Sequence, residues 1–564
     1  MKVFAALPFL AAHAVIAALA APPVATIGQG TITGFTNGTT GVDSFLGMPY
    51  ALPPVRFSRP QPVPDGYGAV TATQFGPACV QPGVPDSQED CLTINVFRPA
   101  GTSASAKLPV SIFIHGGSWV SGSSQQYIGD TFVKDAAAAG KPFILVTHNY
   151  RLGIYGYTGG DSYNNEVQKG NATLNAGYWD QRLAQLWVTK NIAAFGGDPS
   201  KVTLMGQSAG AFSVGAHLTF KTNQDASQRP FRAAIMNSGV QYPVVLPASH
   251  STMSRTYSSL LNYTGCSSLS SSTSLACLRN VSSAALATAN AKIIAGGGLV
   301  IGLLAVMPVL DGDFLPSSPN KLLKAGQFAD VPTLTGDVND EGTIFAPNNT
   351  STDAIFRIAT TVILDSNPLP DPLAIKVLNQ VDFLYPDDQT QGSPYVNGPT
   401  QVSQGVTNAA DPFFPSPPDN QYKRFAALFG DVVFQANRRL LLQNIKSGTP
   451  AWSYIVRQID LGYPLAKGCA HGYDLPYLFG QQPYYASPAL YEPLAQRMRK
   501  AWASFITDLD PRTAESLNWP QYDATTSKTL YQFQGLNETL VTDSYRQTQI
   551  VYLTSDEAAT VFSS

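Results

Sequence analysis

Short apolar runs of strand length alternate with longer helical runs through the first half of the chain. The strand-like runs include Val110–Ile114, Phe143–Asn149, Val202–Met205 and Ala233–Asn237, and the helical run Trp179–Ile192 lies between two of them. A helix between two strands returns the chain to the same edge of a sheet, so this order favours parallel strands with helices on both faces. The sequence therefore predicts an α/β fold with a large, mostly parallel central sheet.

The length of 564 residues would accommodate several ordinary domains, but no clean linker divides the chain. The second half is looser, and residues 367–418 are rich in proline, aspartate and asparagine, which predicts loops and insertions over the sheet. Because α/β folds can extend well beyond the usual domain size, we expect residues 21–564 to form a single domain.

The first residues have the pattern of a signal peptide. Lys2 supplies the positive start, residues 3–19 are apolar apart from His13, and Ala-Leu-Ala at 18–20 matches a small-x-small cleavage site. The apolar stretch is short for a membrane anchor, and no stop-transfer pattern follows it. We therefore expect residues 1–20 to be a signal peptide and the mature protein to be secreted.

The charge balance argues against two classes of partner. A formal net charge of -3 gives no electrostatic reason to bind nucleic acid or an anionic membrane surface. The uncharged stretch Ile293–Leu310 contains four glycines and Pro308, which predicts a buried segment and no membrane span. We expect neither nucleic acid contact nor integral membrane contact.

Secretion makes disulfides the natural interpretation of the cysteines. Cys79 and Cys91 form one close pair and Cys266 and Cys277 another, which suggests two small disulfide loops and leaves Cys469 as a free thiol. Spacing alone does not fix the pairing. Seven N-x-S/T sequons are candidate glycosylation sites, and they begin at Asn37, Asn171, Asn262, Asn280, Asn348, Asn349 and Asn537.

Ser208 lies between two glycines in the stretch Gly-Gln-Ser-Ala-Gly at 206–210. A short β-leaning segment, Lys201–Met205, precedes it and the helical run Ala209–Phe220 follows it. This strand-turn-helix context is typical of a serine nucleophile on a sharp turn, where glycines permit close packing and unusual backbone angles. The alternative is a loop that contains glycine by chance.

A serine nucleophile needs a general base, and the base needs an orienting carboxylate. On this fold the chain order is serine, acid, histidine. His471 fits best, because His217 lies in the helix that follows Ser208 and His250 leaves Asp225 as the one intervening carboxylate. The alternative role for His471 is that of a surface-loop residue.

The acid and the oxyanion donors each have a candidate stretch. Residues 331–345 read VPTLTGDVNDEGTIF, and the spacing leaves three acids open, Asp337, Asp340 and Glu341. Residues 111–124 read SIFIHGGSWVSGSS, a strand that leads into paired glycines. Lipases and esterases use such a loop to aim backbone N–H groups at the substrate carbonyl. The predicted donors are Gly116, Gly117 and Ala209, and the alternative for this loop is a plain glycine-rich turn.

Taken together, these motifs resemble the type-B carboxylesterase/lipase family, which includes cholinesterases and fungal lipases. The matching stretches occur in order over most of the mature chain, and they include FLGMPYALPPVRFSRP from Phe45, SQEDCLTINVFRP from Ser87, HGGSW from His115, WDQRLAQLWVTKNIAAFGGDPSKVTLMGQSAGAFSV from Trp179, GDVNDEG from Gly336 and AHGYDLPYLFG from Ala470.

The resemblance implies an α/β-hydrolase fold and a catalytic triad with no cofactor or metal. It selects Glu341 from the three acids as the partner of Ser208 and His471. It also implies the disulfides Cys79–Cys91 and Cys266–Cys277, and structural ion pairs between Arg56 and Glu89 and between Arg151 and Asp180.

Three positions depart from the family pattern. Gln207 stands where the family usually has glutamate, and Ser118 replaces a usual third glycine. The Cys79–Cys91 loop forms the lid of the family's lipases and holds a choline-binding tryptophan in its cholinesterases. Here the loop is short and contains no tryptophan, so we expect neither a long movable lid nor a choline site.

The sequence as a whole predicts a secreted serine carboxylic-ester hydrolase of broad ester and acylglycerol range that works through an acyl-enzyme. Its partner would be a small-molecule or lipid ester. Trp119 and Phe345, with Ile293–Met307, are candidates for an acyl pocket, although a plain core role fits them equally. The rival predictions are a true triacylglycerol lipase or sterol esterase and, from another class, a non-catalytic binding or adhesion protein on the same fold.

Overall fold

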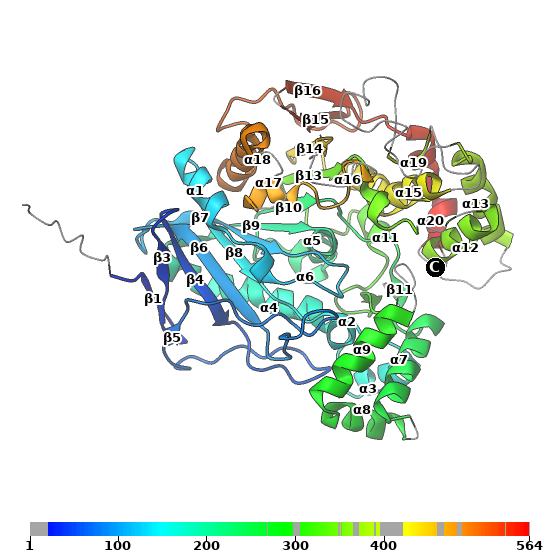
Figure 1. Ribbon diagram of the computed structural model, residues 1–564, viewed down its shortest axis with the longest axis horizontal. Coiled ribbons are helices and arrows are strands. Elements are labelled where there is room, and N and C mark those ends of the chain that lie inside the picture. The colour runs from blue at the N-terminus through cyan, green and yellow to red at the C-terminus, as the bar shows by residue number, and fades with distance from the viewer. Residues whose placement is uncertain are drawn as a thin grey trace, which may run out of the picture.

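The centre of the computed structural model is a mixed sheet of 11 strands (Figure 1). Its strands are β3 (Phe35–Asn37), β4 (Val42–Pro49), β6 (Thr93–Pro99), β7 (Leu108–Ile114), β8 (Ile144–His148), β9 (Gly197–Gln207), β10 (Ala233–Asn237), β13 (Thr333–Val338), β14 (Ala451–Val456), β15 (Thr529–Gln534) and β16 (Asn537–Thr542). Two small sheets accompany it, formed by β1 (Val24–Ile27), β2 (Gly30–Thr33) and β5 (Val70–Thr71), and by β11 (Leu246–Pro247) and β12 (Val309–Leu310).

The large sheet has the strand order β16-β15-β14-β13-β10-β9-β7-β8-β6-β4-β3. Every neighbouring pair from β15 to β8 is parallel. Antiparallel pairing adds β16 at one edge and β6, β4 and β3 at the other. The expected α/β fold with a mostly parallel central sheet is confirmed.

The structure describes residues 21–562 apart from several segments, so the expected signal peptide lies outside it. The segments not described are residue 268 and residues 297–304, 348–349, 351, 365–371, 389–390, 395–420, 460–466, 482–487 and 536. Among the residues that are described, no helix combines the length and the apolar character needed to cross a membrane.

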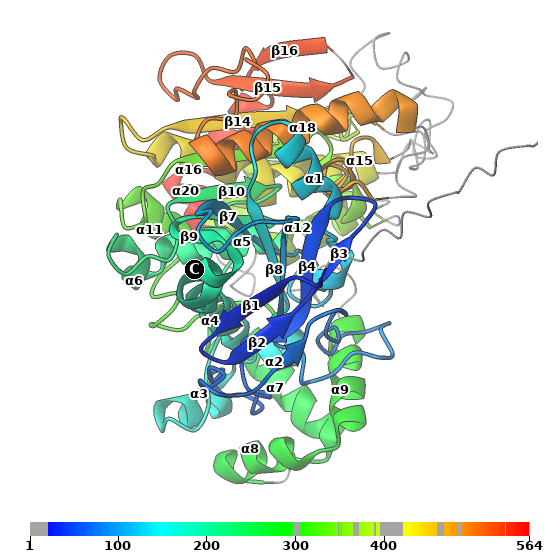
Figure 2. The same ribbon diagram turned by 90° about the vertical axis from the view of Figure 1, so that its left-hand side faces the viewer.

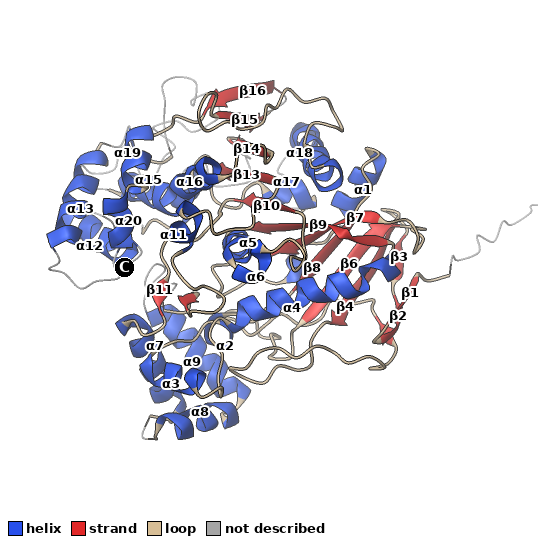
Figure 3. Cartoon of the chain, turned by 180° about the vertical axis from the view of Figure 1, so that it is seen from behind, coloured by secondary structure: helices blue, strands red, loops and turns tan. Residues whose placement is uncertain are grey.

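Helices cover both faces of the sheet, and Figure 3 shows α4 and α5 in front of the strands. The helices are α1 (Asp130–Ala138), α2 (Gly153–Gly156), α3 (Asp161–Gln168), α4 (Ala176–Asn191), α5 (Ala209–Thr219), α6 (Lys221–Gln224), α7 (Ser251–Thr264), α8 (Ser271–Asn280), α9 (Ser283–Gly296), α11 (Pro319–Lys324), α12 (Asp353–Leu364), α13 (Pro372–Leu384), α15 (Tyr422–Gly430), α16 (Ala436–Asn444), α17 (Leu475–Phe479), α18 (Pro488–Asp508), α19 (Gln547–Leu553) and α20 (Asp556–Phe562). Short 3-10 turns are η1 (Ser124–Gln126), η2 (Ile192–Phe195) and η3 (Glu341–Ile344), and η5 (Asp431–Gln435) is a π-helix.

Side chains alternate between two layers of core, as the pleat of a strand requires. Ile112 and Ile114 of β7 join the cluster that contains residues of α4 and α5. Phe113 between them joins the cluster that contains residues of α1, α17 and α18. In β9, Leu204 and Met205 divide in the same way. The sheet is therefore buried on both faces, which explains why its central strands read as continuous apolar runs.

A third apolar cluster lies outside these two layers. Helices α3, α7, α8 and α9 gather in a lobe below the sheet in Figures 1 and 2. Its core includes Met253 and Tyr257 of α7 and Leu286 of α9. The disulfide Cys266–Cys277 joins the segment after α7 to α8 within this lobe.

The predicted strands and helix in the first half agree with the structure. Val110–Ile114 falls in β7, Phe143–Asn149 contains β8, Ala233–Asn237 is β10, and Trp179–Ile192 overlaps α4. The run Val202–Met205 lies in the continuously buried part of the longer β9, whose first five residues include only two exposed ones, Pro199 and Ser200. Apolar patterning therefore located the buried part of this strand and missed its start, which contains no large apolar side chain.

The loop-rich prediction for residues 367–418 was incomplete. Much of this region lies outside the described residues, but α13 is a regular helix of 13 residues within it. Its buried side chains recur at helical spacing along one face, and they are Ala374, Val377, Leu378, Val381 and Leu384. The proline- and aspartate-rich flanks obscured this periodicity.

The disulfides join Cys79 to Cys91 and Cys266 to Cys277, as the resemblance implies. Cys469 is a buried free thiol. The pKa of this thiol is well above its usual value, chiefly because burial disfavours the thiolate. Cys469 therefore lacks the exposed, electropositive surroundings of a reactive cysteine.

The candidate glycosylation sites differ in their exposure. Asn171, Asn262 and Asn280 are exposed. Asn37 is half-buried, and its amide donates to Asp130. Asn348 and Asn349 lie outside the described residues, and Asn537 begins β16. The side-chain amides of Asn171 and Asn280 donate to Glu166 and to the Ala276 carbonyl, so a glycan at either asparagine would replace that hydrogen bond.

Both ion pairs implied by the resemblance are present. Arg56 contacts Glu89 at 2.6 Å, and Arg151 donates to both carboxylate oxygens of Asp180 at 2.7 and 2.8 Å. Asp180 also accepts the backbone N–H of Arg151, and its side chain is fully buried. This second pair fixes the chain just after β8 onto α4.

Asp180→Asn should lower the free energy of unfolding by about 3–5 kcal/mol, because it leaves the Arg151 charge buried without a counter-ion. Asp65→Asn is the control, since Asp65 pairs with Lys190 at a site where both side chains are mostly exposed; it should cause no measurable change. Urea denaturation followed by tryptophan fluorescence measures both. Equal midpoints for the two variants would contradict the structural role of the buried pair.

Candidate active site

The candidate catalytic residues lie at one edge of the sheet. Ser208 follows β9, Glu341 follows β13, and His471 lies in the segment after β14. The glycine loop at 116–117 follows β7. Because these four strands are parallel, their carboxyl ends meet at the same edge, where α/β sheets commonly bind ligands.

Ser208 occupies a sharp turn between β9 and α5. Its backbone has φ 56° and ψ -127°, a conformation that side-chain-bearing residues rarely adopt. A Cβ on Gly206 would lie 2.3 Å from the Gly210 carbonyl oxygen, and one on Gly210 would lie 1.9 Å from that of Ile114. The glycines on either side of the serine are thus required by backbone contact, and the Ser208 N–H donates to Asn237 O at 3.1 Å.

His471 and Glu341 are held side by side by a backbone bridge. Asp340 and Ala470 form an isolated parallel β-bridge, and the next residue of each segment is Glu341 and His471. Oε2 of Glu341 lies 2.5 Å from Nδ1 of His471. The other carboxylate oxygen accepts the N–H of Val338 at 2.8 Å. The imidazole is therefore oriented with Nδ1 toward the carboxylate and Nε2 facing away from it.

The other two acids in this stretch have different partners. Asp337 is fully buried and accepts a hydrogen bond from Nε of Arg438 at 2.7 Å. Asp340 accepts the backbone N–H of Cys469 at 3.0 Å and the Ser393 hydroxyl at 2.9 Å. Of the three candidates that the spacing left open, Glu341 contacts the histidine.

The glycine loop packs directly against the serine. A Cβ on Gly116 would lie 2.9 Å from Cβ of Ser208. Gly117, Ser118 and Trp119 all have positive φ, so Ser118 takes a left-handed conformation although it lacks the freedom of glycine. Within the described part of the chain, the backbone N–H groups of Gly116, Gly117 and Ala209 have no acceptor. They are available to an oxyanion beside Ser208.

His115 orients the first peptide of this loop. Burial lowers the pKa of His115 to about 3, so the ring is neutral at physiological pH. Its Nδ1 lies 2.8 Å from the Gly116 carbonyl oxygen, and a neutral ring can donate there only with its proton on Nδ1. The ring of Tyr150 stacks on His115 at 4.4 Å between centroids. This histidine is a structural support for the loop.

Gln207, the departure from the family pattern, contacts the histidine. Its amide nitrogen lies 3.3 Å from Nε2 of His471 and can donate to it, since Nδ1 faces Glu341. The substitution removes a negative charge from this position and supplies a neutral donor. The sequence shows the departure at Gln207 but does not predict this contact, because Gln207 and His471 are far apart in the chain.

An aromatic layer links the predicted pocket residues Trp119 and Phe345. The ring centroids of Trp119 and Phe212 are 5.9 Å apart, those of Phe212 and Phe434 are 5.7 Å apart, and those of Phe434 and Phe345 are 6.0 Å apart. Phe345 and Phe434 also contact the ring of His471. Phe212 of α5 and Phe434 of the π-helix η5 were not predicted from the sequence, because their contact joins segments far apart in the chain.

The third part of the predicted pocket is divided between two apolar clusters, and its Met307 end lies in the cluster that contains Trp119 and Phe345. Residues 297–304 of the stretch Ile293–Met307 lie outside the described residues. Ile293 packs in the core of the α7–α9 lobe, and Met307 packs in the core beside the sheet. The described ends of this stretch therefore have core roles.

A buried acid near the triad was also missed. Asp474 is fully buried three residues after His471 and accepts the amide of Asn237 at 3.2 Å. Burial, helped by the charge of Glu341, raises the pKa of Asp474 to about 6. This second acid favours its neutral form in mildly acidic solution, which limits the negative charge next to Glu341.

The disulfide loop lies beside the glycine loop and contains no helix. Residues 80–90 form turns, and residues 82–86 are all exposed. A cleft of about 880 Å³ opens on one side of His471, lined in part by Ile344 and Phe479. Ile344 is 41% exposed, and polar side chains such as Gln125, Asp130 and Gln481 also line the cleft, so the approach to this histidine is open to solvent and mixed in polarity.

Comparisons with known proteins agree over nearly the whole chain. The model of the "Carboxylesterase family" matches residues 21–553. The chain is 34% identical to "Lipase 1" of Geotrichum candidum, with 97% of this chain and 98% of that protein covered. It is also 34% identical to "Secreted lipase 1" of Botryotinia fuckeliana (strain B05.10), with 95% and 93% covered.

A solved structure supports the fold assignment. The crystal structure of Aspergillus niger EstA matches with a TM-score of 0.77 at 27% identity, and the match covers 95% of this chain and 99% of that one. The expected α/β-hydrolase fold is confirmed by this likeness.

Glu341→Gln should reduce kcat by about 10³–10⁴-fold, because the amide cannot hold the histidine in the correct tautomer or stabilise its charged form. Asp340→Asn is the control at the neighbouring position, since that side chain contacts Cys469 and Ser393. It should retain most of the activity. Steady-state hydrolysis of p-nitrophenyl butyrate measures both, and a larger loss at Asp340 would assign the acid role to that residue instead.

Proposed function

The chain belongs to the carboxylesterase family of carboxylic ester hydrolases, and on that basis we propose that it is a serine esterase that works through an acyl-enzyme. The observation that carries the proposal is the grouping at one sheet edge of a serine on a strained turn, three N–H groups that have no acceptor among the described residues, and a carboxylate-oriented histidine. This is the set of groups that acyl transfer requires.

In the first half of the reaction, Ser208 Oγ attacks the ester carbonyl carbon while His471 Nε2 takes the hydroxyl proton. The tetrahedral oxyanion accepts hydrogen bonds from the N–H groups of Gly116, Gly117 and Ala209. His471 then donates its proton to the ester oxygen as the C–O bond breaks. The alcohol leaves, and the acyl group remains on Ser208.

In the second half, water attacks the acyl carbon and His471 takes one of its protons. The second oxyanion uses the same three N–H groups. When this intermediate collapses, the bond to Ser208 Oγ breaks, the proton returns to that oxygen, and the carboxylic acid leaves. Glu341 stabilises the charged imidazole in both halves.

The aromatic layer supports an apolar acyl site. Phe212, Phe345 and Phe434 contact one another or His471, so an acyl chain bound beside Ser208 would meet apolar surface. Such a wall recognises chains by area and not by specific hydrogen bonds, which supports a broad range of esters and acylglycerols. Trp119 is part of the same wall.

Secretion as a single domain is part of the proposal. The two disulfides fit an oxidising compartment, and a relative carries the name "Secreted lipase 1". One family model over residues 21–553 supports one domain that begins just after the predicted signal peptide. Glycans at the exposed Asn171, Asn262 and Asn280 would fit the same route.

Ser208→Ala should abolish hydrolysis and labelling by a fluorophosphonate probe, because no other group can form the acyl-enzyme. The variant should be secreted and should unfold at the same temperature as the wild type. A non-catalytic binding protein on this fold would leave even the wild type unlabelled. If the alanine variant retained a tenth of wild-type turnover, another residue would be the nucleophile.

The relatives named as lipases favour a true triacylglycerol lipase as the second candidate function. The short disulfide loop favours an esterase, because residues 80–90 have neither the length nor the helix of a movable lid. The rate of tributyrin hydrolysis should therefore rise as a smooth hyperbola through the solubility limit. A sharp increase at that limit would instead indicate activation at an oil surface and another segment acting as a lid.

A further inference from the structure

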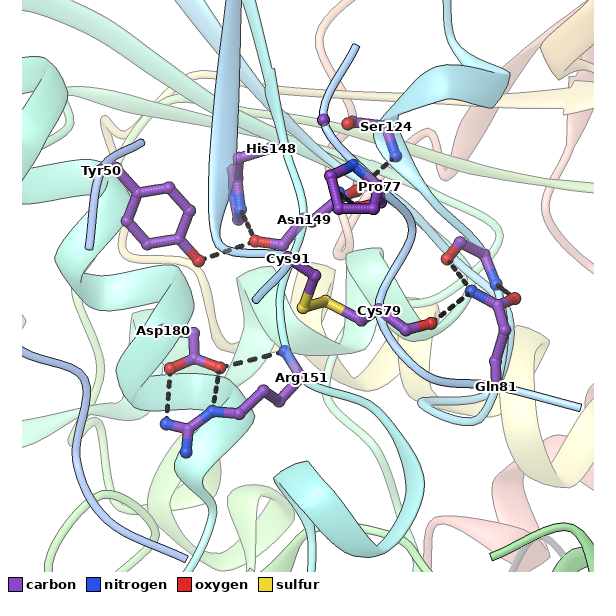
Figure 4. Close-up of a disulfide and its surroundings, with 12 residues drawn as sticks. Tyr50, Pro77, Cys79, Gln81, Cys91, Ser124, His148, Asn149, Arg151 and Asp180 are labelled. Atoms are coloured by element: carbon purple, nitrogen blue, oxygen red, sulfur yellow. Dashed lines mark hydrogen bonds and ion pairs between the residues drawn. A yellow bond between two sulfur atoms is a disulfide. The ribbon is translucent and has the colours of Figure 1, made fainter. Parts of the chain in front are cut away.

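The disulfide loop contacts the glycine loop through one buried side chain. Gln81 is 9% exposed, and its amide pairs with both backbone groups of Gly122. The Gly122 N–H donates to Oε1 of Gln81 at 2.9 Å, and Nε2 of Gln81 donates to the Gly122 carbonyl at 2.9 Å (Figure 4). The same Nε2 donates to the Cys79 carbonyl at 3.0 Å. We call these three hydrogen bonds of the Gln81 amide the clamp, and they connect Gly122 to a cysteine of the disulfide.

Gly122 in turn lies against the carbonyl of Gly116. A Cβ on Gly122 would be 2.6 Å from Gly116 O and 2.6 Å from Nδ1 of His115. The residue has φ 104°, a conformation that favours glycine. The backbone of Gly122 therefore limits the space in which the Gly116 carbonyl and its His115 donor can move.

The position of the Gly116 carbonyl decides where one oxyanion donor points. The C=O of Gly116 and the N–H of Gly117 belong to the same planar peptide. Rotation of that plane moves both groups together, so a contact on the carbonyl side fixes the N–H on the opposite side. The His115 hydrogen bond at 2.8 Å and the Gly122 contact both act on this carbonyl.

The frame that holds Gln81 is fixed at several points. The disulfide closes the loop at Cys79 and Cys91, and Arg56 holds Glu89 near its far end. A second amide spans the same two segments, because Asn149 donates to Pro77 O at 2.9 Å and accepts from the N–H of Ser124 at 2.8 Å (Figure 4). The two amides attach residues 122–124 to the segment that enters the disulfide loop.

We propose that Gln81 is a positioning residue of the oxyanion hole, through which the short disulfide loop braces the peptide that carries the Gly117 N–H. The inference rests on the proposed esterase function. It gives the disulfide loop a role in the chemical step, in an enzyme where that loop is too short to cover the site.

The test compares two substitutions at Gln81 with the same two at Gln88. Gln81→Leu removes both sides of the clamp, and the isosteric Gln81→Glu keeps the acceptor but replaces the donor to Gly122 and Cys79 with a carboxylate. Gln88→Leu and Gln88→Glu are the matched controls, because this exposed side chain in the same loop makes no hydrogen bond to the described residues. Active sites are counted with a fluorophosphonate, and rates are expressed per active site.

We expect kcat for p-nitrophenyl butyrate to fall about 10- to 100-fold in both Gln81 variants. A misplaced oxyanion donor should lower kcat by no more than complete removal of that donor would. KM should stay within twofold. Inhibition by an aryl trifluoromethyl ketone, whose adduct places an oxyanion in the hole, should weaken by the same factor as kcat. The Gln88 variants should match the wild type in all three quantities.

Two results would overturn the proposal. In one, kcat per active site and the ketone inhibition constant stay within twofold of the wild type in both Gln81 variants. In the other, the variants lose thermal stability and active sites, but the sites that remain turn over at the wild-type rate, so that Gln81 is merely structural. Failure of the esterase proposal would look different, because the wild type itself would then not be labelled by the fluorophosphonate.

Discussion

The strained turn at Ser208 is the constraint on which the rest of the site depends. A serine at φ 56° and ψ -127° persists only where the surroundings leave no alternative. Here the backbones of β9, α5 and the end of β7 meet at contacts that exclude any side chain on Gly206 or Gly210. The two cores on either side of the sheet hold those elements in place. Packing on both faces of the sheet therefore stabilises the strained turn, and this turn places the Ser208 hydroxyl at the edge of the sheet.

A group of buried charged residues lies close to Glu341 of the proposed triad. Arg438 links Asp337 to Asp543, and all three side chains are almost fully buried. Removal of any one of them would leave charge without compensation in a medium that solvates it poorly. Asp474 adds a second buried acid near Glu341, and burial raises its pKa to about 6. Several buried charged groups therefore lie near the proposed triad without being part of it.

The sequence predicted the parts of the site that depend on local pattern. Ser208 and the paired glycines could be recognised within one segment, because glycines at fixed positions indicate a tight turn or close backbone packing. Spacing left Asp337, Asp340 and Glu341 open, and the family resemblance alone selected Glu341. The contact with His471 depends on the bridge between Asp340 and Ala470, residues far apart in the chain. The contacts of Gln207, Phe434 and Asp474 depend on the same tertiary pairing. Helix α13 was locally encoded but hidden by its flanks.

The ends of the disulfide loop contact the rest of the molecule, whereas its tip is exposed to solvent. Residues 82–86 are exposed, whereas Gln81 and Glu89 carry the contacts to the rest of the molecule. Each doubling of a flexible loop costs only about 0.6 kcal/mol of closure entropy, and the disulfide anchors both ends whatever lies between them. The tip can therefore lengthen without disturbing the chemistry beneath it. Inserted sequence at this point could give a carboxylic ester hydrolase of this kind a cover of its own, so that the presence of a lid becomes a variable of evolution or design that is independent of the framework around Ser208.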